Sequence, residues 1–306
     1  MIVLNLHAAA VNAVTFSADG RWLVSAGDDG DVWLTDLHWE CGRHRLAWGA
    51  KFVFAVGLSP DSERLAVGTD SGVLILRHAE QGWRPMLQRR DHGGWVTSVR
   101  FDPSGDLLAS TGNDGQVRLW DATRRRRRPW RTLLAPLGPL RCVRFSPDGR
   151  FVAAAGLAGL ALWHPLRPEP CFVYRLRDAQ AHSLDFSPDG RFLWIGTTRS
   201  ILRLDTESAH TETIVSGNVN LFRCLQACPR SGLLLLGRDD GCVQVLDVSD
   251  PMAPVEPLPR LYPCHQAAVN GLAIHPDGEI AATAGDDNRV CLWPLDFPVS
   301  AAVQLQ

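Results

Sequence analysis

The sequence predicts an all-β protein: a seven-bladed β-propeller of four-stranded antiparallel blades, closed by pairing of its N- and C-terminal strands. Two observations support this fold class. A turn signature of the type FSPDG recurs seven times along the 306 residues. The segments between the signatures have the alternating or short continuous apolar pattern of strands, and none has a helical period. Four short strands in every 40–45 residues, repeated around an axis, are typical of a propeller.

The turn signatures divide the chain into units of nearly equal length. Their last residues are Gly20, Ser62, Gly105, Gly149, Gly190, Gly232 and Gly278. Seven such units fill the chain, so we expect a single domain over residues 1–306 and no room for a second one. The predicted units are residues 7–48, 49–91, 92–135, 136–176, 177–217, 218–264 and 265–306.

The third unit shows the predicted strand order most clearly. TSVRF at 97–101 leads into the turn DPSG, and LLAST at 107–111 follows as a second strand. The turn NDG then precedes QVRLW at 116–120, and a weaker fourth strand is expected at Trp130–Leu134. Glycine, asparagine and aspartate mark tight turns between such strands. One blade cannot bury both of its faces alone, so we expect each blade to pack against the next.

Closure of the ring requires a strand from outside the last unit, because an unpaired edge would otherwise remain. Residues Ile2–Leu6 precede the first unit, and we expect them to form the outer strand of the seventh blade. The C-terminal segment Val299–Gln306 also has a strand-like pattern and is the alternative source.

Three units contain a histidine, a hydroxyl residue 18 positions later and an aspartate 22 positions later. Two of them add a tryptophan. The sets are His92, Ser110, Asp114 and Trp120 in the third unit, His265, Thr283, Asp287 and Trp293 in the seventh, and His7, Ser25 and Asp29 in the first, with Thr35 in place of tryptophan. This pattern resembles the WD-repeat family, and the resemblance covers essentially the whole chain.

The resemblance implies a structural role for these residues. In WD-repeat blades the aspartate accepts a hydrogen bond from the histidine, the histidine contacts the hydroxyl group, and the hydroxyl group contacts the tryptophan indole N–H. We therefore expect the set to join strands within a blade rather than to form a catalytic triad. It is complete only in the third and seventh units. The second, fourth and sixth units keep Asp70, Trp163 and Asp240 alone, and the fifth keeps none.

The resemblance also implies a partner-binding face. Its contact positions lie six and four residues before the first residue of each turn signature and one residue before the aspartate of the second turn. The positions four residues before are Asn12, Phe54, Thr97, Arg141, His182, Arg223 and Asn270. Aromatic and arginine side chains dominate binding hot spots. The candidate partner-binding residues are therefore Phe52, Phe54, Trp95, Arg141, His182, Leu221 and Arg223, with the large apolar ones expected to be exposed.

A run of five arginines lies between the third and fourth strands of the third unit, followed by Pro129, Trp130 and Arg131. The candidate polyanion-binding residues are Arg124, Arg125, Arg126, Arg127 and Arg128. Such a loop suits a polyanion, either nucleic acid or anionic lipid. An acidic protein partner and an ordinary solvated loop are the alternatives. The formal net charge of −2 argues against a generally basic nucleic-acid binder.

The sequence has no phosphate-cradling, dinucleotide-binding or zinc-protease motif, so we expect no catalytic residues, cofactor or metal. An enzyme with a site at the channel mouth is the remaining catalytic alternative. The eight cysteines are scattered without a CxxC pair, which favours reduced thiols and a cytoplasmic location. No apolar run is long enough for a membrane span. The expected function is a non-catalytic scaffold that binds a protein or peptide, as a monomeric propeller or as part of a larger assembly.

Overall fold

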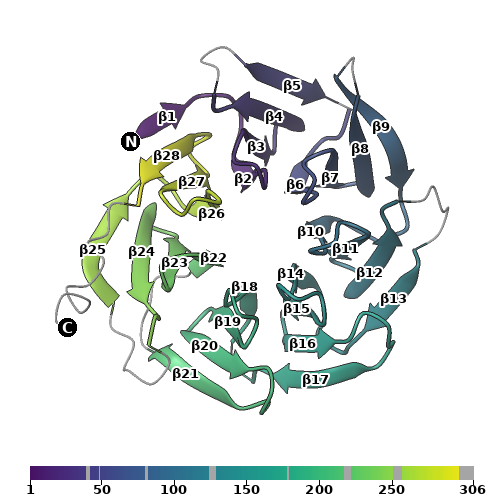
Figure 1. The fold of residues 1–306 in the computed structure, drawn as a ribbon, viewed down its shortest axis with the longest axis vertical. Helices are drawn as coiled ribbons and strands as arrows, with labels where there is room; N and C mark the ends of the chain where they lie inside the picture. Colours follow the sequence, from purple (N-terminus) through teal and green to yellow (C-terminus); the bar gives the residue numbers. More distant parts are fainter. Residues whose placement is uncertain are drawn as a thin grey trace.

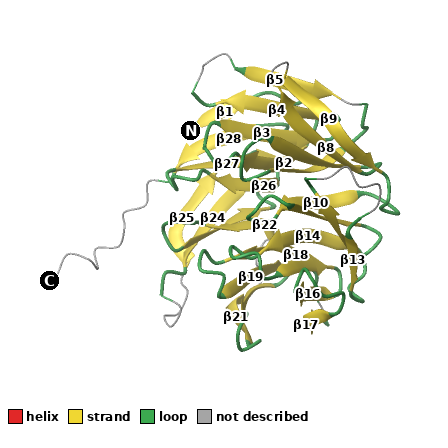
Figure 2. Ribbon diagram, turned by 45° about the vertical axis from the view of Figure 1, so that its right-hand side comes forward, coloured by secondary structure: helices red, strands yellow, loops and turns green. Residues whose placement is uncertain are grey.

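The computed structural model of the protein describes residues 1–38, 42–47, 49–79, 82–123, 129–177, 179–216, 222–250 and 257–295. Seven four-stranded antiparallel sheets surround one central axis, as the sequence predicts (Figure 1). The described residues contain no helix, and Figure 2 shows strands joined by short loops throughout.

Each blade runs outward from the axis in chain order. The innermost strands, which line the central channel, are β2 (Val11–Phe16), β6 (Val53–Leu58), β10 (Val96–Phe101), β14 (Leu140–Phe145), β18 (Ala181–Phe186), β22 (Phe222–Ala227) and β26 (Val269–Ile274). The second strands are β3 (Trp22–Gly27), β7 (Arg64–Thr69), β11 (Leu107–Gly112), β15 (Val152–Gly156), β19 (Phe192–Thr197), β23 (Leu233–Arg238) and β27 (Ile280–Gly285).

The outer half of each blade completes the sheet. The third strands are β4 (Asp31–Asp36), β8 (Val73–Ala79), β12 (Gln116–Asp121), β16 (Gly159–Trp163), β20 (Ser200–Asp205), β24 (Cys242–Asp247) and β28 (Val290–Pro294). The outermost strands are β5 (Arg43–Ala47), β9 (Gly82–Arg89), β13 (Arg131–Leu134), β17 (Pro170–Arg175), β21 (Thr211–Ser216), β25 (Pro257–Pro263) and, from the other end of the chain, β1 (Ile2–Leu4).

The recurrent turn signature connects the first and second strands of every blade. Its last residue has a positive φ in all seven blades, between 58° and 78°. Glycine adopts this left-handed conformation without a steric penalty, which explains six of the seven positions. Ser62 is the exception, with φ of 58°.

Apolar packing lies between blades rather than within them. The buried side chains form seven clusters, and each cluster combines residues from two adjacent blades. One of them joins Val11 and Leu23 of blade one to Leu4, Ala282 and Leu292 of blade seven. Each blade therefore covers its neighbour, all the way around the ring.

The N-terminal segment closes the ring, as expected. Strand β1 pairs antiparallel with β28, with Ile2 opposite Leu292 and Leu4 opposite Val290. The strand ends at Leu4, two residues earlier than the predicted Ile2–Leu6. The alternative segment, Val299–Gln306, lies outside the described residues.

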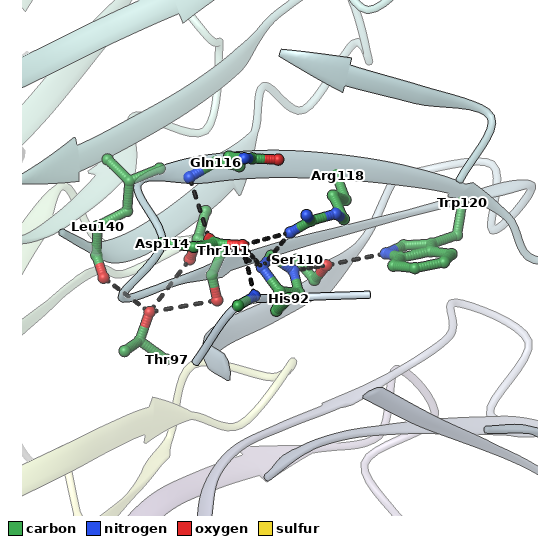
Figure 3. Close-up of polar contacts among 10 residues, drawn as sticks. His92, Thr97, Ser110, Thr111, Asp114, Gln116, Arg118, Trp120 and Leu140 are labelled. Carbon is green, nitrogen blue, oxygen red and sulfur yellow. Dashed lines mark hydrogen bonds and ion pairs between the residues drawn. The ribbon is translucent and has the colours of Figure 1, made fainter. Parts of the chain in front are cut away.

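Blade three contains the complete polar set that the sequence predicts (Figure 3). His92 Nδ1 lies 3.1 Å from the Asp114 carboxylate, His92 Nε2 lies 2.7 Å from Ser110 Oγ, and the Trp120 indole N–H donates to Ser110 Oγ at 2.8 Å. Arg118 is an addition that the pattern did not include, with its guanidinium 2.6 Å from Asp114 Oδ2. Burial, with a further contribution from the Arg118 charge, lowers the pKa of His92 and favours neutral imidazole.

The sequence predicted a complete polar set in blade seven as well as in blade three, and for blade seven this prediction is wrong. His265 contacts Asp287 at 2.7 Å and Thr283 Oγ1 at 2.9 Å. The buried indole N–H of Trp293, however, has no hydrogen-bond partner among the described residues. The Trp293 ring instead stacks on Tyr262 of blade six, with centroids 5.2 Å apart. The fully connected set is therefore confined to blade three.

Blade one has the first three members of the set. His7 Nδ1 lies 3.0 Å from Asp29, and His7 Nε2 lies 2.9 Å from Ser25 Oγ. Thr35, at the tryptophan position, is buried, and its hydroxyl has no partner in the described part of the chain. In blade four the Trp163 N–H is similarly unpaired within the described residues.

Candidate binding site at the mouth of the channel

A β-bulge at the start of every innermost strand positions the candidate contact residues. In all seven blades the register to the second strand shifts between the first and third residues of the innermost strand. The residue between them is an extra one, and such a residue is re-aimed relative to the strand alternation. These seven residues, which we call the mouth ring, are Asn12, Phe54, Thr97, Arg141, His182, Arg223 and Asn270.

The mouth ring surrounds one end of the central channel. All seven residues line a single cavity of about 460 Å³, together with Phe222 and Asp239. The contact positions predicted four residues before each turn signature therefore meet in one place, because the bulge falls at the same position in each blade.

An aromatic cluster of Phe52, Phe54 and Trp95 lies on the blade two and blade three side of the mouth. The Phe54 and Trp95 rings stack with centroids 5.0 Å apart and an interplanar angle of 22°, and Phe52 lies 6.1 Å from Phe54. Trp95 is 47% exposed. Phe52 and Phe54 are only half-buried rather than exposed as expected, because the three rings cover one another.

The side of the mouth formed by blades six, seven and one is acidic, and its charges are already paired. Within blades one and seven, the amides of Asn12 and Asn270 donate to Asp28 at 2.7 Å and to Asp286 at 2.6 Å. In blade six, Arg223 pairs with Asp239 and donates to Asn270 Oδ1 at 2.8 Å. In blades one, six and seven the contact position on the innermost strand thus bonds the contact position at the second turn, and Arg223 links blades six and seven.

Arg141 is the unpaired cation of the mouth. It is exposed and forms no hydrogen bond or ion pair with any residue that the structure describes. His182, in the next blade, is half-buried. Burial lowers the pKa of His182, and the Arg141 charge lowers it further, so the imidazole is neutral near pH 7.

Two predicted sites cannot be placed, because their residues lie outside the part of the chain that the structure describes. One is the mouth residue Leu221. The other is the whole arginine run, which consists of Arg124, Arg125, Arg126, Arg127 and Arg128. The described strands on either side of that run are β12, which ends at Asp121, and β13, which begins at Arg131. The polyanion loop therefore remains a prediction from the sequence.

Sequence reasoning missed a second ring of channel residues. The fifth residues of five innermost strands line the channel at the end opposite the mouth, and they are Thr15, Arg100, Arg144, Gln226 and Ala273. We call them the inner ring. The sequence did contain a signal for this position, because blades three, four and five each have a charged residue there. A position in an apolar core does not normally hold a charged side chain.

The described residues hold no group of three histidine, cysteine or acidic side chains that could bind a metal ion. They also contain no helix with the length and apolar character needed to cross a membrane. Seven of the cysteines are described, and each has a free thiol.

Comparison with known proteins decides the family. The sequence model described as "WD domain, G-beta repeat" matches residues 1–36, 83–121, 127–163 and 256–294. The chain is a WD-repeat propeller. The matched segments contain all three histidine sets, and the segment in blade four contains Trp163. The family model therefore matches the blades that have a histidine set or a tryptophan on the third strand.

Several curated WD-repeat relatives cover different parts of this chain. The small ribosomal subunit protein RACK1 of Candida albicans is 31% identical over 123 residues, 37% of this chain and 37% of its own length. The transcriptional corepressor LEUNIG_HOMOLOG of Arabidopsis thaliana is 24% identical over 290 residues, 94% of this chain and 35% of its own length. The pre-mRNA-processing factor 19 homolog 2 of the same plant is 31% identical over 210 residues, 66% of this chain and 38% of its own length. The matches thus span little more than a third of each relative.

Proposed function

We propose that this WD-repeat propeller is a non-catalytic scaffold whose channel mouth binds a peptide segment of a protein partner. The observation that carries the proposal is that the aromatic cluster and Arg141 meet at one cavity, which Phe54 and Arg141 both line. Trp95 is 47% exposed and stacked on Phe54, and aromatic and arginine side chains around one cavity have the composition of a binding hot spot.

The mouth favours a partner segment of defined chemistry. An apolar side chain would cover Trp95 and Phe54, and an acidic side chain beside it would pair with Arg141. Across the mouth, Asp28 and Asp286 are accepting hydrogen bonds from asparagine amides, and their negative charge would repel a second acidic group. We therefore propose a segment with its acidic residue at the blade three and blade four side.

The names of the relatives support a role in assembly. They place these proteins in a ribosomal subunit, in transcriptional repression and in pre-mRNA processing. The partner of this chain is a matter for experiment, because the matches cover only part of each relative. A cytoplasmic location is likewise part of the proposal, and the free thiols of the seven described cysteines favour it.

The double variant Trp95→Ala with Arg141→Ala tests the proposal. We expect the wild-type chain to capture a defined set of proteins from source lysate, identified by mass spectrometry, and the double variant to lose them while its melting temperature stays unchanged. The matched control is Leu166→Ala with Arg150→Ala, an apolar residue 62% exposed and an arginine whose side chain is 69% exposed, both away from the mouth. Retention of the captured proteins by the Trp95 and Arg141 variant, or their loss from the control alone, would contradict the proposal.

A further inference from the structure

The central channel contains two further cavities besides the one at its mouth. Below the mouth, a cavity of about 110 Å³ extends along the innermost strands. A cavity of about 350 Å³ occupies the opposite end, beneath the turn signatures. Arg100 and Arg144, neighbours in the inner ring, are the charged residues that line both cavities.

Positive charge in this part of the channel exceeds negative charge. The cavity below the mouth is lined by Arg100, Arg141, Arg144 and Arg223, and no acidic side chain is among its described lining residues. Arg223 is neutralised at the mouth by Asp239 and Asp286. Arg100 and Arg144 share one nearby carboxylate, that of Asp185, which lies 3.5 Å from Arg144 Nε.

The Asp185 carboxylate compensates only weakly for the excess positive charge of the channel. Its Oδ2 accepts a hydrogen bond from the Ala227 backbone N–H at 3.0 Å. Burial raises the pKa of Asp185 in spite of the nearby arginine, so the channel disfavours its charged form.

Arg100 forms no ion pair with an acidic side chain in the described chain, although the charge of Asp185 acts on it from a greater distance. Its guanidinium donates to the backbone carbonyls of Val56 at 2.8 Å and Val99 at 2.9 Å. Burial, with repulsion from Arg144, lowers the pKa of Arg100 to about 9. Arg100 is half-buried in the channel wall, and a charge withdrawn from bulk water is normally paired, because an uncompensated one is costly.

We propose that the channel binds one oxyanion, a phosphate or carboxylate group, held by Arg100 and Arg144. Guanidinium groups bind both kinds of group through paired N–H donors. The buried hydroxyl of Ser183, which is 5% exposed and has no hydrogen-bond partner within the described residues, borders the same cavity and can add a donor. The small cavity fits a single group rather than a polymer.

Calorimetric titration of inorganic phosphate into the full chain tests this proposal at low ionic strength. We expect one saturable site per chain and a melting temperature that rises with phosphate concentration. Arg100→Gln should weaken phosphate binding by about tenfold or more, since it removes a charge-assisted contact. It should still fold, because it leaves no carboxylate unpaired. Arg150→Gln, at an exposed turn, is the matched control and should bind as the wild type does.

The source of the oxyanion is distinguished by a second probe. Acetate titrated in the same way measures affinity for a carboxylate. Tighter phosphate binding assigns the site to a phosphoryl group or free phosphate, and comparable affinities assign it to an acidic side chain entering from the mouth. Absence of saturable phosphate and acetate binding up to about 10 mM, or equal binding by Arg100→Gln and wild type, would overturn the proposal. Because Trp95→Ala should leave phosphate binding intact, this outcome is separable from that of the peptide-binding test.

Discussion

At the scale of single residues, Ser110 is the junction of the polar set in blade three. Its hydroxyl group contacts both His92 and Trp120, at 2.7 Å and 2.8 Å. Ser110→Ala therefore leaves two buried groups without this partner. We expect the variant to lose about 1–3 kcal/mol of unfolding free energy, measured by urea denaturation.

Thr35 provides the contrast in blade one. Its buried hydroxyl has no hydrogen-bond partner in the described chain, so Thr35→Val removes an unsatisfied group instead of creating one. The unfolding free energy should stay equal or rise by up to about 1 kcal/mol. A loss in Thr35→Val as large as that in Ser110→Ala would show that hydrogen-bond satisfaction is not what distinguishes the two positions.

The sequence predicted which residues form the polar sets but not how completely they bond. The WD-repeat resemblance, which rests partly on the spacing of His265, Thr283 and Asp287, implied two contacts that the structure contains. It could not predict that Trp293 would stack on Tyr262, because Tyr262 comes from the outer strand of the preceding blade. A pattern internal to one repeat carries no information about packing between repeats.

At the scale of elements, the alternation of apolar and polar residues predicted the strands of each sheet but gave no indication of the β-bulges. The offset of the contact position from each turn signature came from the family resemblance, and the bulge gives that offset a physical cause. The extra residue shifts the alternation once per innermost strand, in the same place in blades as different as three and five. A period-two reading of those strands places the mouth residue on the wrong face. The exposure of Phe52 and Phe54 was overestimated for a related reason, since neighbouring blades bring the rings together.

The blades should also differ in local stability. Blades four, five and six lack the histidine set, and their polar contribution to holding the sheet together is smaller. We expect amides of β15, β19 and β23 to exchange with deuterium faster than those of β11 in native-state hydrogen exchange, because local opening breaks fewer interactions there.

Apolar packing is the competing influence in this comparison. Trp163, Trp194 and Phe222 are fully buried in blades four, five and six, so packing alone could equalise the blades. Equal protection of β11, β15, β19 and β23 would show that it does, and that the polar set adds nothing to local stability.

At the scale of the whole molecule, stability depends on a closed circle of inter-blade contacts. Each of the seven apolar clusters needs both of its blades. The blade one and blade seven boundary is distinctive, because its cluster joins residues from the two ends of the chain. Innermost strands β2 and β26 also contact each other across this boundary. The boundary between blades one and seven is therefore held by contacts between residues that are the farthest apart in the sequence.

Deletion of residues 1–6 tests this dependence. It removes all of β1, exposes the edge of β28, and takes Leu4, which is 6% exposed, out of the cluster between blades seven and one. Loss of a buried leucine alone costs about 2–5 kcal/mol, and for a chain larger than 150 residues each kcal/mol corresponds to about 2–4 °C. We expect the melting temperature to fall by about 10 °C or more, recorded by differential scanning calorimetry.

Deletion of residues 297–306 is the matched control, since it shortens the chain at the other end and removes none of the four strands of blade seven. Its melting temperature should change much less than that of the N-terminal deletion. If the C-terminal deletion were the more damaging of the two, Val299–Gln306 would contribute more to ring stability than β1 does. The N-terminal deletion also leaves Arg100, Arg144 and Trp95 in place, so its effect on stability can be separated from effects on the channel and the mouth. A variant that melts earlier but still binds phosphate below its melting temperature would show that the ring can lose its closing strand and keep its channel.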